Sequence, residues 1–319
     1  MTAKRLSADQ SAQRIGQSFG PQPWVLAFPE ARALAGRIAS RLALPLEAVS
    51  VHRFPDGERR VRLPAALPPE IALVQRLDDP DARLVALMLA AETARELGAH
   101  RIVLVAPYLC YMRQDRAFQP GEAVSQRIVG RFLARLCDAL VTVDPHLHRT
   151  RRLEEAVPLP EAASVSAAPL LARHIAAARP GALLLAPDAE AAAWVRAGAE
   201  AAGLEWATAR KERHGDREVE VALDDPARCR GRCVCLLDDV ASTGATLAAA
   251  ARAARAAGAA EVCAAVTHAL FVGDALGRLR AAGVTEIWSA DTVPHPTNAV
   301  SVAAPLAAAV AGLLRLEGA

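Results

Sequence analysis

Short apolar runs alternate with longer helical stretches along almost the whole chain, and this alternation limits the fold more than any other feature. The first half contains the strand-like runs WVLAF, IALVQ, RIVLVAPYL and ALVTVDPH. The second half contains ALLLAPD, RCVCLLDD, EVCAAVTHALF and EIWSAD. Between them lie helical stretches such as LVALMLAAETARELGA and LAAAARAARAAGA. Strands joined by helices need crossover connections, so we expect an α/β protein with mainly parallel sheets flanked by helices.

The two halves also resemble each other. ARELGAHRIVLVAPYL matches ARAAGAAEVCAAVTHAL, and Gly98 and Gly258 of these stretches lie 160 positions apart. DALVTVDPHLH is echoed by VTEIWSADTVPH in the same way. We therefore predict two tandem domains related by an internal repeat. The boundary is expected in the proline-interrupted stretch EEAVPLPEAASVSAAPL, where helix and strand are both disfavoured. This gives a loose tail over residues 1–20, a first domain over 21–160 and a second over 161–319.

The composition excludes several classes of protein. Hydrophobic residues make up 53% of the 319 residues and aromatic residues 4%, so Ala, Leu and Val must build the cores. The 37 basic and 35 acidic residues leave a net charge of +2, which argues against a dedicated nucleic-acid-binding protein. No apolar run reaches membrane-spanning length and the N-terminus lacks a signal-peptide pattern, so we expect no membrane association.

The six cysteines form no CxxC pair. Cys233 and Cys235 alternate along RCVCLL, which is typical of a strand with both thiols on one face. Because cysteine behaves as a small hydrophobic residue, buried reduced thiols are favoured over a metal or redox site. We therefore expect a cytoplasmic protein.

The stretch LLDDVASTGATLAAA, residues 236–250, predicts a ligand site. Small polar residues between a strand and a helix direct backbone N–H groups and the positive end of the helix dipole at a phosphate. The stretch has neither the Gly-Lys-Ser/Thr of a Walker A loop nor a GxGxxG. Asp238 and Asp239 would repel an anion, but carboxylates accept hydrogen bonds from vicinal hydroxyls. A ribose 5-phosphate satisfies both halves, with its diol on these aspartates.

The phosphate of such a ligand would lie on Ser242, Thr243, Gly244, Ala245 and Thr246. The alternative interpretation is an acidic turn that only caps the helix through Ser242 or Thr243.

Three other stretches place polar residues at turns or strand ends. RFPDGERRVRL puts Phe54, Asp56 and Glu58 around a glycine, a pattern that by itself favours a β-turn with solvated charges over a binding site. APYLCYMRQDRAF follows a predicted strand with an Arg-Gln pair, Arg113 and Gln114, at the strand end where parallel sheets bind ligands. VTVDPHLHR likewise ends a strand and carries His146 and His148 beside Asp144. A lone histidine at such a place is usually structural, and the alternative is a contact with a magnesium–triphosphate group.

In this order, FPDGE, PYLCYMRQDR and VDPHLH before DDVASTGAT resemble the ribose-phosphate pyrophosphokinases, which share the last loop with the phosphoribosyltransferase superfamily. The resemblance covers about residues 22 to 310. It implies two tandem phosphoribosyltransferase-like domains and transfer of pyrophosphate from MgATP to the 1-hydroxyl of ribose 5-phosphate, which gives phosphoribosyl pyrophosphate and AMP. Mg²⁺ is the implied metal, and a homo-oligomer with nucleotide sites shared between subunits is the implied assembly.

The resemblance also implies roles for single residues. Phe54, Asp56 and Glu58 would contact the adenine of ATP from a neighbouring subunit. The remaining nucleotide contacts would come from Arg113, Gln114, Asp115 and His146.

The other implied roles concern metals and phosphoryl transfer. His146 would touch the metal–triphosphate group, and Asp188 in LLLAPDAEAA would bind the second metal or the ribose. Lys211 and Arg213 in RKERHGDREVEV would be transition-state cations on a mobile loop, although this stretch also fits an ordinary hairpin with solvated charges.

The chain departs from the family pattern in three places. Ala-Glu-Ala-Ala follows Asp188 where many members have glycines. DPHLH has two histidines where members usually have one, and the phosphate loop contains Ser-Thr-Gly-Ala where the best-known members commonly have a version with Asp-Thr. Two other functions stay open. A phosphoribosyltransferase would use the same loop without needing FPDGE and YMRQDR, and a catalytically silent regulatory subunit would be expected to lose the loop aspartates or Lys211 and Arg213.

Overall fold

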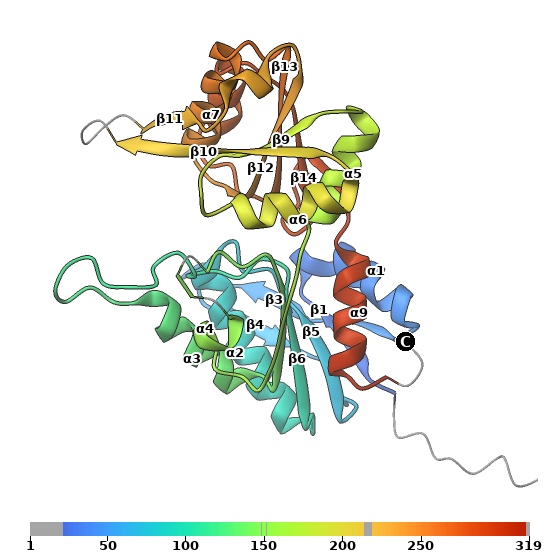
Figure 1. Ribbon diagram of the computed structural model, residues 1–319. Helices are drawn as coiled ribbons and strands as arrows, with labels where there is room; N and C mark the ends of the chain where they lie inside the picture. Colours follow the sequence, from blue (N-terminus) through green and yellow to red (C-terminus); the bar gives the residue numbers. More distant parts are fainter. Residues whose placement is uncertain (1–21, 148, 151, 214–218, 317–319) are drawn as a thin grey trace, which may run out of the picture.

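The computed structural model describes residues 22–147, 149–150, 152–213 and 219–316, and within these ranges it contains two large sheets and one separate hairpin (Figure 1). The first sheet has the order β2-β1-β5-β6-β7-β8, and all its neighbouring strands are parallel. Its strands are β1 (Trp24–Ala27), β2 (Leu46–Ala48), β5 (Glu70–Val74), β6 (Arg101–Ala106), β7 (Ala139–Val143) and β8 (Glu161–Val165). The first half also contains η1 (Pro29–Ala31), α1 (Arg32–Leu42), α2 (Pro80–Glu96), α3 (Ser125–Leu136) and α4 (Leu153–Ala156).

The second sheet has the order β11-β10-β9-β12-β13-β14-β15. Only the β10–β11 pair at its edge is antiparallel within the described residues. Its strands are β9 (Leu183–Ala186), β10 (Glu205–Arg213), β11 (Val219–Leu223), β12 (Cys233–Ala241), β13 (Glu261–Ala269), β14 (Val284–Ala290) and β15 (Asn298–Val300). The helices are α5 (Ala168–Ala178), α6 (Ala192–Ala202), η2 (Pro226–Cys229), α7 (Ala245–Ala256), α8 (Ala275–Ala281) and α9 (Ala303–Leu313). The separate hairpin consists of β3 (Ser50–Arg53) and β4 (Arg59–Arg62).

The central strands are buried on both faces, which explains why they read as continuous apolar runs. In β6, Val103 and Val105 belong to the core under α1 and α9, whereas Ile102 and Leu104 belong to the core under α2 and α3. The expected α/β fold with parallel sheets flanked by helices is therefore confirmed. Among the helices that the structure describes, none combines the length and the apolarity that a membrane-spanning segment requires.

The sequence repeat is also a repeat of hydrogen bonds. Gly98 and Gly258 both end a helix with positive φ, +95° and +88°. In each turn an arginine three positions earlier donates to the two carbonyls that follow the glycine. Arg95 donates to the carbonyls of residues 99 and 100 at 3.3 and 2.8 Å, and Arg255 donates to those of residues 259 and 260 at 3.1 and 3.0 Å. The glycines are needed because a side chain would be strained at this φ.

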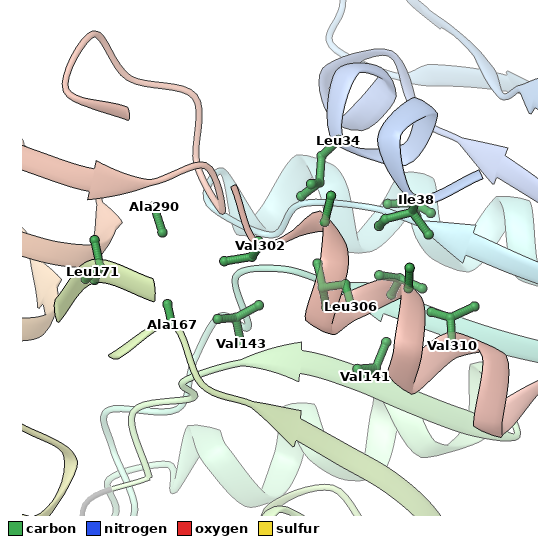
Figure 2. Packing of buried hydrophobic residues seen from close by; sticks show 14 of the residues in the cluster. Leu34, Ile38, Val141, Val143, Ala167, Leu171, Ala290, Val302, Leu306 and Val310 are labelled. Atoms are coloured by element: carbon green, nitrogen blue, oxygen red, sulfur yellow. The ribbon is translucent and has the colours of Figure 1, made fainter. Parts of the chain in front are cut away.

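The last helix of the chain crosses back to the first half, whereas the helix after β8 packs on the second. α5 follows β8 at the edge of the first sheet but packs against α6 and β13 to β15 of the second. α9 follows β15 at the edge of the second sheet but packs against α1 and β6 to β8 of the first, beside α1 in the lower half of Figure 1. Figure 2 shows Leu306 and Val310 of α9 near Ile38 and Val141. One apolar core therefore runs through both halves.

The stretch expected to disfavour helix and strand contains both, so that expectation is wrong. Glu161–Val165 forms the edge strand β8, paired with β7, and α5 begins at Ala168 with Pro169 in its first turn. A proline is tolerated there because the first N–H groups of a helix have no partner within the helix. The division at residue 160 stays a prediction. We propose to move it to the residues after Val165 and to assign α9 to the first half.

Candidate active site

A cavity of about 610 Å³ lies where the carboxyl ends of strands from both sheets meet. This volume is in the range of small-molecule sites, and the carboxyl ends of parallel strands are where such sheets bind ligands. The first half contributes Arg113, the residues after β7 and Ser164. The second half contributes the start of α6 and the whole stretch 238–247. Sequence segments about 90 residues apart thus form one site.

The loop between β12 and α7 has the geometry expected of a phosphate cradle. Its five residues, Ser242, Thr243, Gly244, Ala245 and Thr246, all line the cavity. The residue that precedes α7 is Gly244, at φ +70°, and no side chain caps the helix. The interpretation as a cap through Ser242 or Thr243 is therefore wrong. The N-terminus of α7, with its unpaired first N–H groups, therefore borders the cavity, as anion binding requires.

Asp238 and Asp239 lie at the end of β12, half-buried, and both line the cavity. Burial and the nearby charges of Asp239 and Asp188 raise the pKa of Asp238 well above its ordinary value. Burial also acts to raise the pKa of Asp239, but the hydrogen bond and charge of His146 outweigh it, so that pKa is lowered. The pair therefore holds one readily ionised carboxyl group and one that resists ionisation while the cavity contains no further cation.

His146 comes from the other half of the chain and reaches this pair. Its Nδ1 lies 2.5 Å from Oδ2 of Asp239. Burial acts to lower the pKa of His146, but the hydrogen bond and charge of Asp239 raise it above its ordinary value overall. An imidazolium–carboxylate contact thus joins the two halves across the cavity.

Asp188 and Glu190 line the same cavity at the start of α6. Oδ1 of Asp188 accepts hydrogen bonds from the N–H groups of Glu190 and Ala191 at 3.1 and 3.2 Å. Together with the aspartate pair, these carboxylates supply the oxygen donors that Mg²⁺ prefers. Burial is the largest cause of the raised pKa of Asp238, and the charges of Asp239 and Asp188 add to it, so a bound cation would favour its ionised form. The residues therefore fit a magnesium site.

Arg113 also lines the cavity, and among the described residues it has no ion-pair partner. Its neighbours Gln114 and Asp115 do not reach the described lining of the cavity. The carboxylate of Asp115 is instead 5% exposed and pairs with Arg149 at 3.2 Å. This pair ties the loop after β6 to the loop after β7. The nucleotide roles of these residues stay predictions.

The FPDGE turn is the tip of the hairpin β3–β4. Phe54 is 37% exposed, and Gly57 has a φ of +100°. Oδ1 of Asp56 accepts a hydrogen bond from the N–H of Glu58 at 3.0 Å. The described lining of the cavity contains none of Phe54, Asp56 and Glu58. Their predicted contact with a neighbouring subunit's nucleotide is compatible with this exposure but stays a prediction.

Lys211 and Arg213 lie on β10, opposite Val221 and Val219 of β11. The β10–β11 hairpin extends from the edge of the second sheet, at the left of Figure 1. Residues 214–218 between the strands, and His148 of DPHLH, lie outside the described residues. The backbone of β10 and β11 thus forms the hairpin that the alternative interpretation expects. The catalytic role of Lys211 and Arg213 stays a prediction.

Three residues that were not selected from the sequence also line the cavity: Glu190, Trp194 and Thr150. A usable signal existed for one of them. Ala191 and Trp194 are three positions apart, so they share a face of α6, and Asp188 lies just before that helix. Trp194, on the face of α6 that borders the cavity, could therefore have been expected near Asp188, the candidate metal ligand.

A second group of potential metal ligands lies away from this cavity. Ligand atoms of Cys233, Glu261 and Cys263 lie within 4.8 Å of one another. Both oxygens of Glu261 already accept hydrogen bonds from Arg179 at 2.9 Å, and Oε1 accepts a further one from Thr285 at 3.1 Å. All six cysteines are free, and all but Cys233 are buried, as expected of reduced thiols. We therefore interpret this group as a structural cluster.

Comparisons with known proteins agree with this geometry. Residues 24–136 match the model of the N-terminal domain of ribose phosphate pyrophosphokinase, and residues 225–307 match that of the phosphoribosyl synthetase-associated domain. A ribose-phosphate pyrophosphokinase of Methanopyrus kandleri is 40% identical over 91% of this chain and 99% of that protein. One from Methanothermobacter thermautotrophicus is 33% identical over 90% and 99%. The crystal structure of phosphoribosylpyrophosphate synthetase from Mycobacterium smegmatis is similar with a TM-score of 0.78, at 25% identity over 92% of this chain and 100% of that one.

Proposed function

Because the chain belongs to the ribose-phosphate pyrophosphokinase family, we propose that it transfers the pyrophosphoryl group of MgATP to the 1-hydroxyl of ribose 5-phosphate. The sugar hydroxyl oxygen attacks the β-phosphorus of ATP. The bond between that phosphorus and the oxygen bridging to the α-phosphorus breaks, the hydroxyl proton is lost, and phosphoribosyl pyrophosphate and AMP are the products. In such transfers, positioning and charge stabilisation supply most of the acceleration.

One observation carries the proposal: a phosphate-cradle loop, two adjacent carboxylates and a histidine from the other half of the chain meet in one cavity. The loop from Ser242 to Thr246 would hold the 5-phosphate with its N–H groups and hydroxyls. Asp238 and Asp239 would accept hydrogen bonds from the ribose diol. This leaves the 1-hydroxyl facing the part of the cavity that Arg113 and His146 line.

We place the triphosphate in that part of the cavity. Arg113, whose side chain has no ion-pair partner among the described residues, would meet phosphoryl oxygens. His146, whose pKa Asp239 raises, would do the same in its protonated form. Asp188 would hold Mg²⁺, which when bound would neutralise the triphosphate. His146 would contact the metal–triphosphate group through a phosphate oxygen or a metal-bound water, because a protonated imidazole has no free lone pair for the metal. Lys211 and Arg213 would reach the phosphates from the hairpin in a closed state.

We further propose that the protein acts in the cytoplasm as a homo-oligomer. Phe54, Asp56 and Glu58 are exposed on a hairpin outside the cavity lining, so they would contact the nucleotide bound in a neighbouring chain. Gln114 and Asp115 would complete that nucleotide site through the loop after β6.

The test is AMP formation by the purified protein from ATP and Mg²⁺, with and without ribose 5-phosphate. AMP should form in amounts equal to phosphoribosyl pyrophosphate and only when the sugar phosphate is present. A phosphoribosyltransferase would instead consume phosphoribosyl pyrophosphate with a nitrogenous base and release pyrophosphate. A silent subunit would bind both substrates and release nothing, and either result would overturn the proposal.

A further inference from the structure

A group of buried polar side chains lies beneath the cavity, where the end of β7 meets the second half. Asp144, Thr267 and His268 are 8%, 0% and 2% exposed. None of them has a part in the phosphoryl transfer described above. Buried polar groups of this kind are tolerated only when they are hydrogen-bonded, so their partners indicate what they hold together.

The carboxylate of Asp144 is held by the second half. Its Oδ2 accepts hydrogen bonds from the Thr267 hydroxyl and the Ala167 N–H, both at 2.8 Å. Its Oδ1 accepts one from the indole N–H of Trp194, also at 2.8 Å. These donors lie on β13, at the start of α5 and on α6. Three of the roughly four acceptor positions of this carboxylate are thus occupied, and all three donors belong to the second half, so the side chain acts as a structural anchor.

The backbone beside Asp144 is held from the same side. Nε2 of His268 lies 3.0 Å from the carbonyl oxygen of Val143 and 3.2 Å from that of Asp144. Because carbonyls only accept hydrogen bonds, Nε2 carries a proton. Burial lowers the pKa of His268 to about 4. Its Nδ1 lies 2.9 Å from the hydroxyl oxygen of Thr292, which itself donates to the carbonyl of Thr267 at 2.7 Å.

The backbone of Asp144 needs such support. Its φ of +34° lies in the left-handed region that side-chain-bearing residues rarely adopt. This turn redirects the chain after β7, and His146, two residues later, then meets Asp239 at 2.5 Å. β13 pairs with β12 with Val240 opposite His268 and Asp238 opposite Val266. The anchors of the turn and the aspartate pair therefore stand on neighbouring strands of one rigid sheet.

We propose that Thr267 and His268 are positioning residues that fix Asp144 and thereby set His146 beside Asp239 and the ribose-phosphate loop. This inference rests on the proposed function for its kinetic readout. It extends that function by assigning the alignment of the two halves of the site to two buried side chains on β13.

The principal test is Thr267→Val, which keeps the shape of the side chain and removes the hydroxyl donor. We expect kcat to fall by ~10- to 100-fold, the size of effect that small misplacements of reacting groups produce. The KM for ribose 5-phosphate should stay within about threefold, since the loop after β12 is untouched. Thr267→Ser should restore most of kcat. Thr142→Val is the matched control, because Thr142 is a buried threonine on β7 whose hydroxyl has no partner among the described residues. It should leave kcat unchanged.

A double-mutant cycle separates positioning from general support of the fold. If Thr267 acts through His146, Thr267→Val should lower kcat in the natural chain but hardly lower the residual kcat of His146→Ala. An equal fold-loss in both backgrounds, or no loss in the natural one, would overturn the inference. Trp194→Phe, which removes another donor to Asp144, replaces Thr267→Val in the cycle if that variant does not fold.

A structural readout makes the inference independent of the activity. Crystal structures of the natural chain and of Thr267→Val should show the His146–Asp239 contact only in the first. An unchanged contact would refute the positioning role even if kcat had fallen. If the natural chain itself formed no AMP, the proposed function would fail while this comparison would still decide the positioning role.

Discussion

Replacing Asp239 by asparagine should weaken the binding of ribose 5-phosphate by about 10- to 150-fold. Hydrogen bonds to a charged group contribute ~1.5–3 kcal/mol each, and ~1.4 kcal/mol corresponds to a factor of ten. Oδ2 of Asp239 already contacts His146, but a carboxylate offers about four lone-pair positions, so Oδ1 remains available to a sugar hydroxyl. The side chain is 23% exposed, and water therefore screens this charge only partly. Asparagine keeps the size of the side chain and removes the charge.

Calorimetric titration of the variant with ribose 5-phosphate and, separately, with a non-hydrolysable ATP analogue measures this effect. The affinity for the ATP analogue should fall much less than that for ribose 5-phosphate, because Asp239 reaches the nucleotide part of the cavity only through its contact with His146. Asp225→Asn is a suitable control. Asp225 caps η2 by accepting a hydrogen bond from Ala227, and neither residue belongs to the described cavity lining. An asparagine caps equally well, so both affinities should be those of the natural chain.

Two results would refute the reasoning. Unchanged affinity for ribose 5-phosphate would mean that Asp239 does not meet the sugar. An equal loss of affinity for both ligands would mean that the aspartate pair serves the nucleotide or the fold instead.

Three other predictions concern assembly, turnover and pH. Inactive Phe54→Ala chains mixed with inactive Asp239→Ala chains should recover part of the activity if subunits share a site, and failure to recover it after proven subunit exchange would exclude sharing. Lys211→Ala and Arg213→Ala should each lower kcat by ~10²–10⁴-fold and leave both KM values within a few-fold. The reason is that cations that meet the phosphates only in the closed state stabilise the transition state more than the bound substrates. Near-normal turnover in either variant would mean that β10–β11 is an ordinary hairpin. The raised pKa of His146 stabilises the fold fully below the ordinary pKa of 6.5, and this stabilisation is lost as the pH rises through the folded-state pKa. The lowered pKa of Asp239 stabilises the fold above the ordinary pKa of 3.8, and this stabilisation is lost as the pH falls through the folded-state pKa. His146→Gln should therefore lower the free energy of unfolding most between about pH 4 and 6.5, as urea titrations at several pH values would measure, and a loss that does not vary with pH would count against the ion pair.

Much of the fold could be predicted because its signals are local. Strands such as β6 and β12 are buried on both faces and read as unbroken apolar runs, and the intervening helices are long enough to be recognised. The repeat around Gly98 and Gly258 could be seen because both turns need the same residue at a positive φ. The short edge strand β8 could not be predicted. Its five residues have no strong pattern and become a strand only by pairing with β7.

The sequence by itself determined the class of fold and predicted the chemistry of the loop from Asp238 to Thr246, because both depend on residue types at neighbouring positions. Only the tertiary structure decided that His146 meets Asp239 across 93 positions of the chain, and that three donors of the second half hold Asp144. It also decided that α9 crosses back to the first half. Periodicity reports which face of an element is buried but not which partner covers it. The partner follows from how the sheets are placed, and this depends on packing over the whole chain.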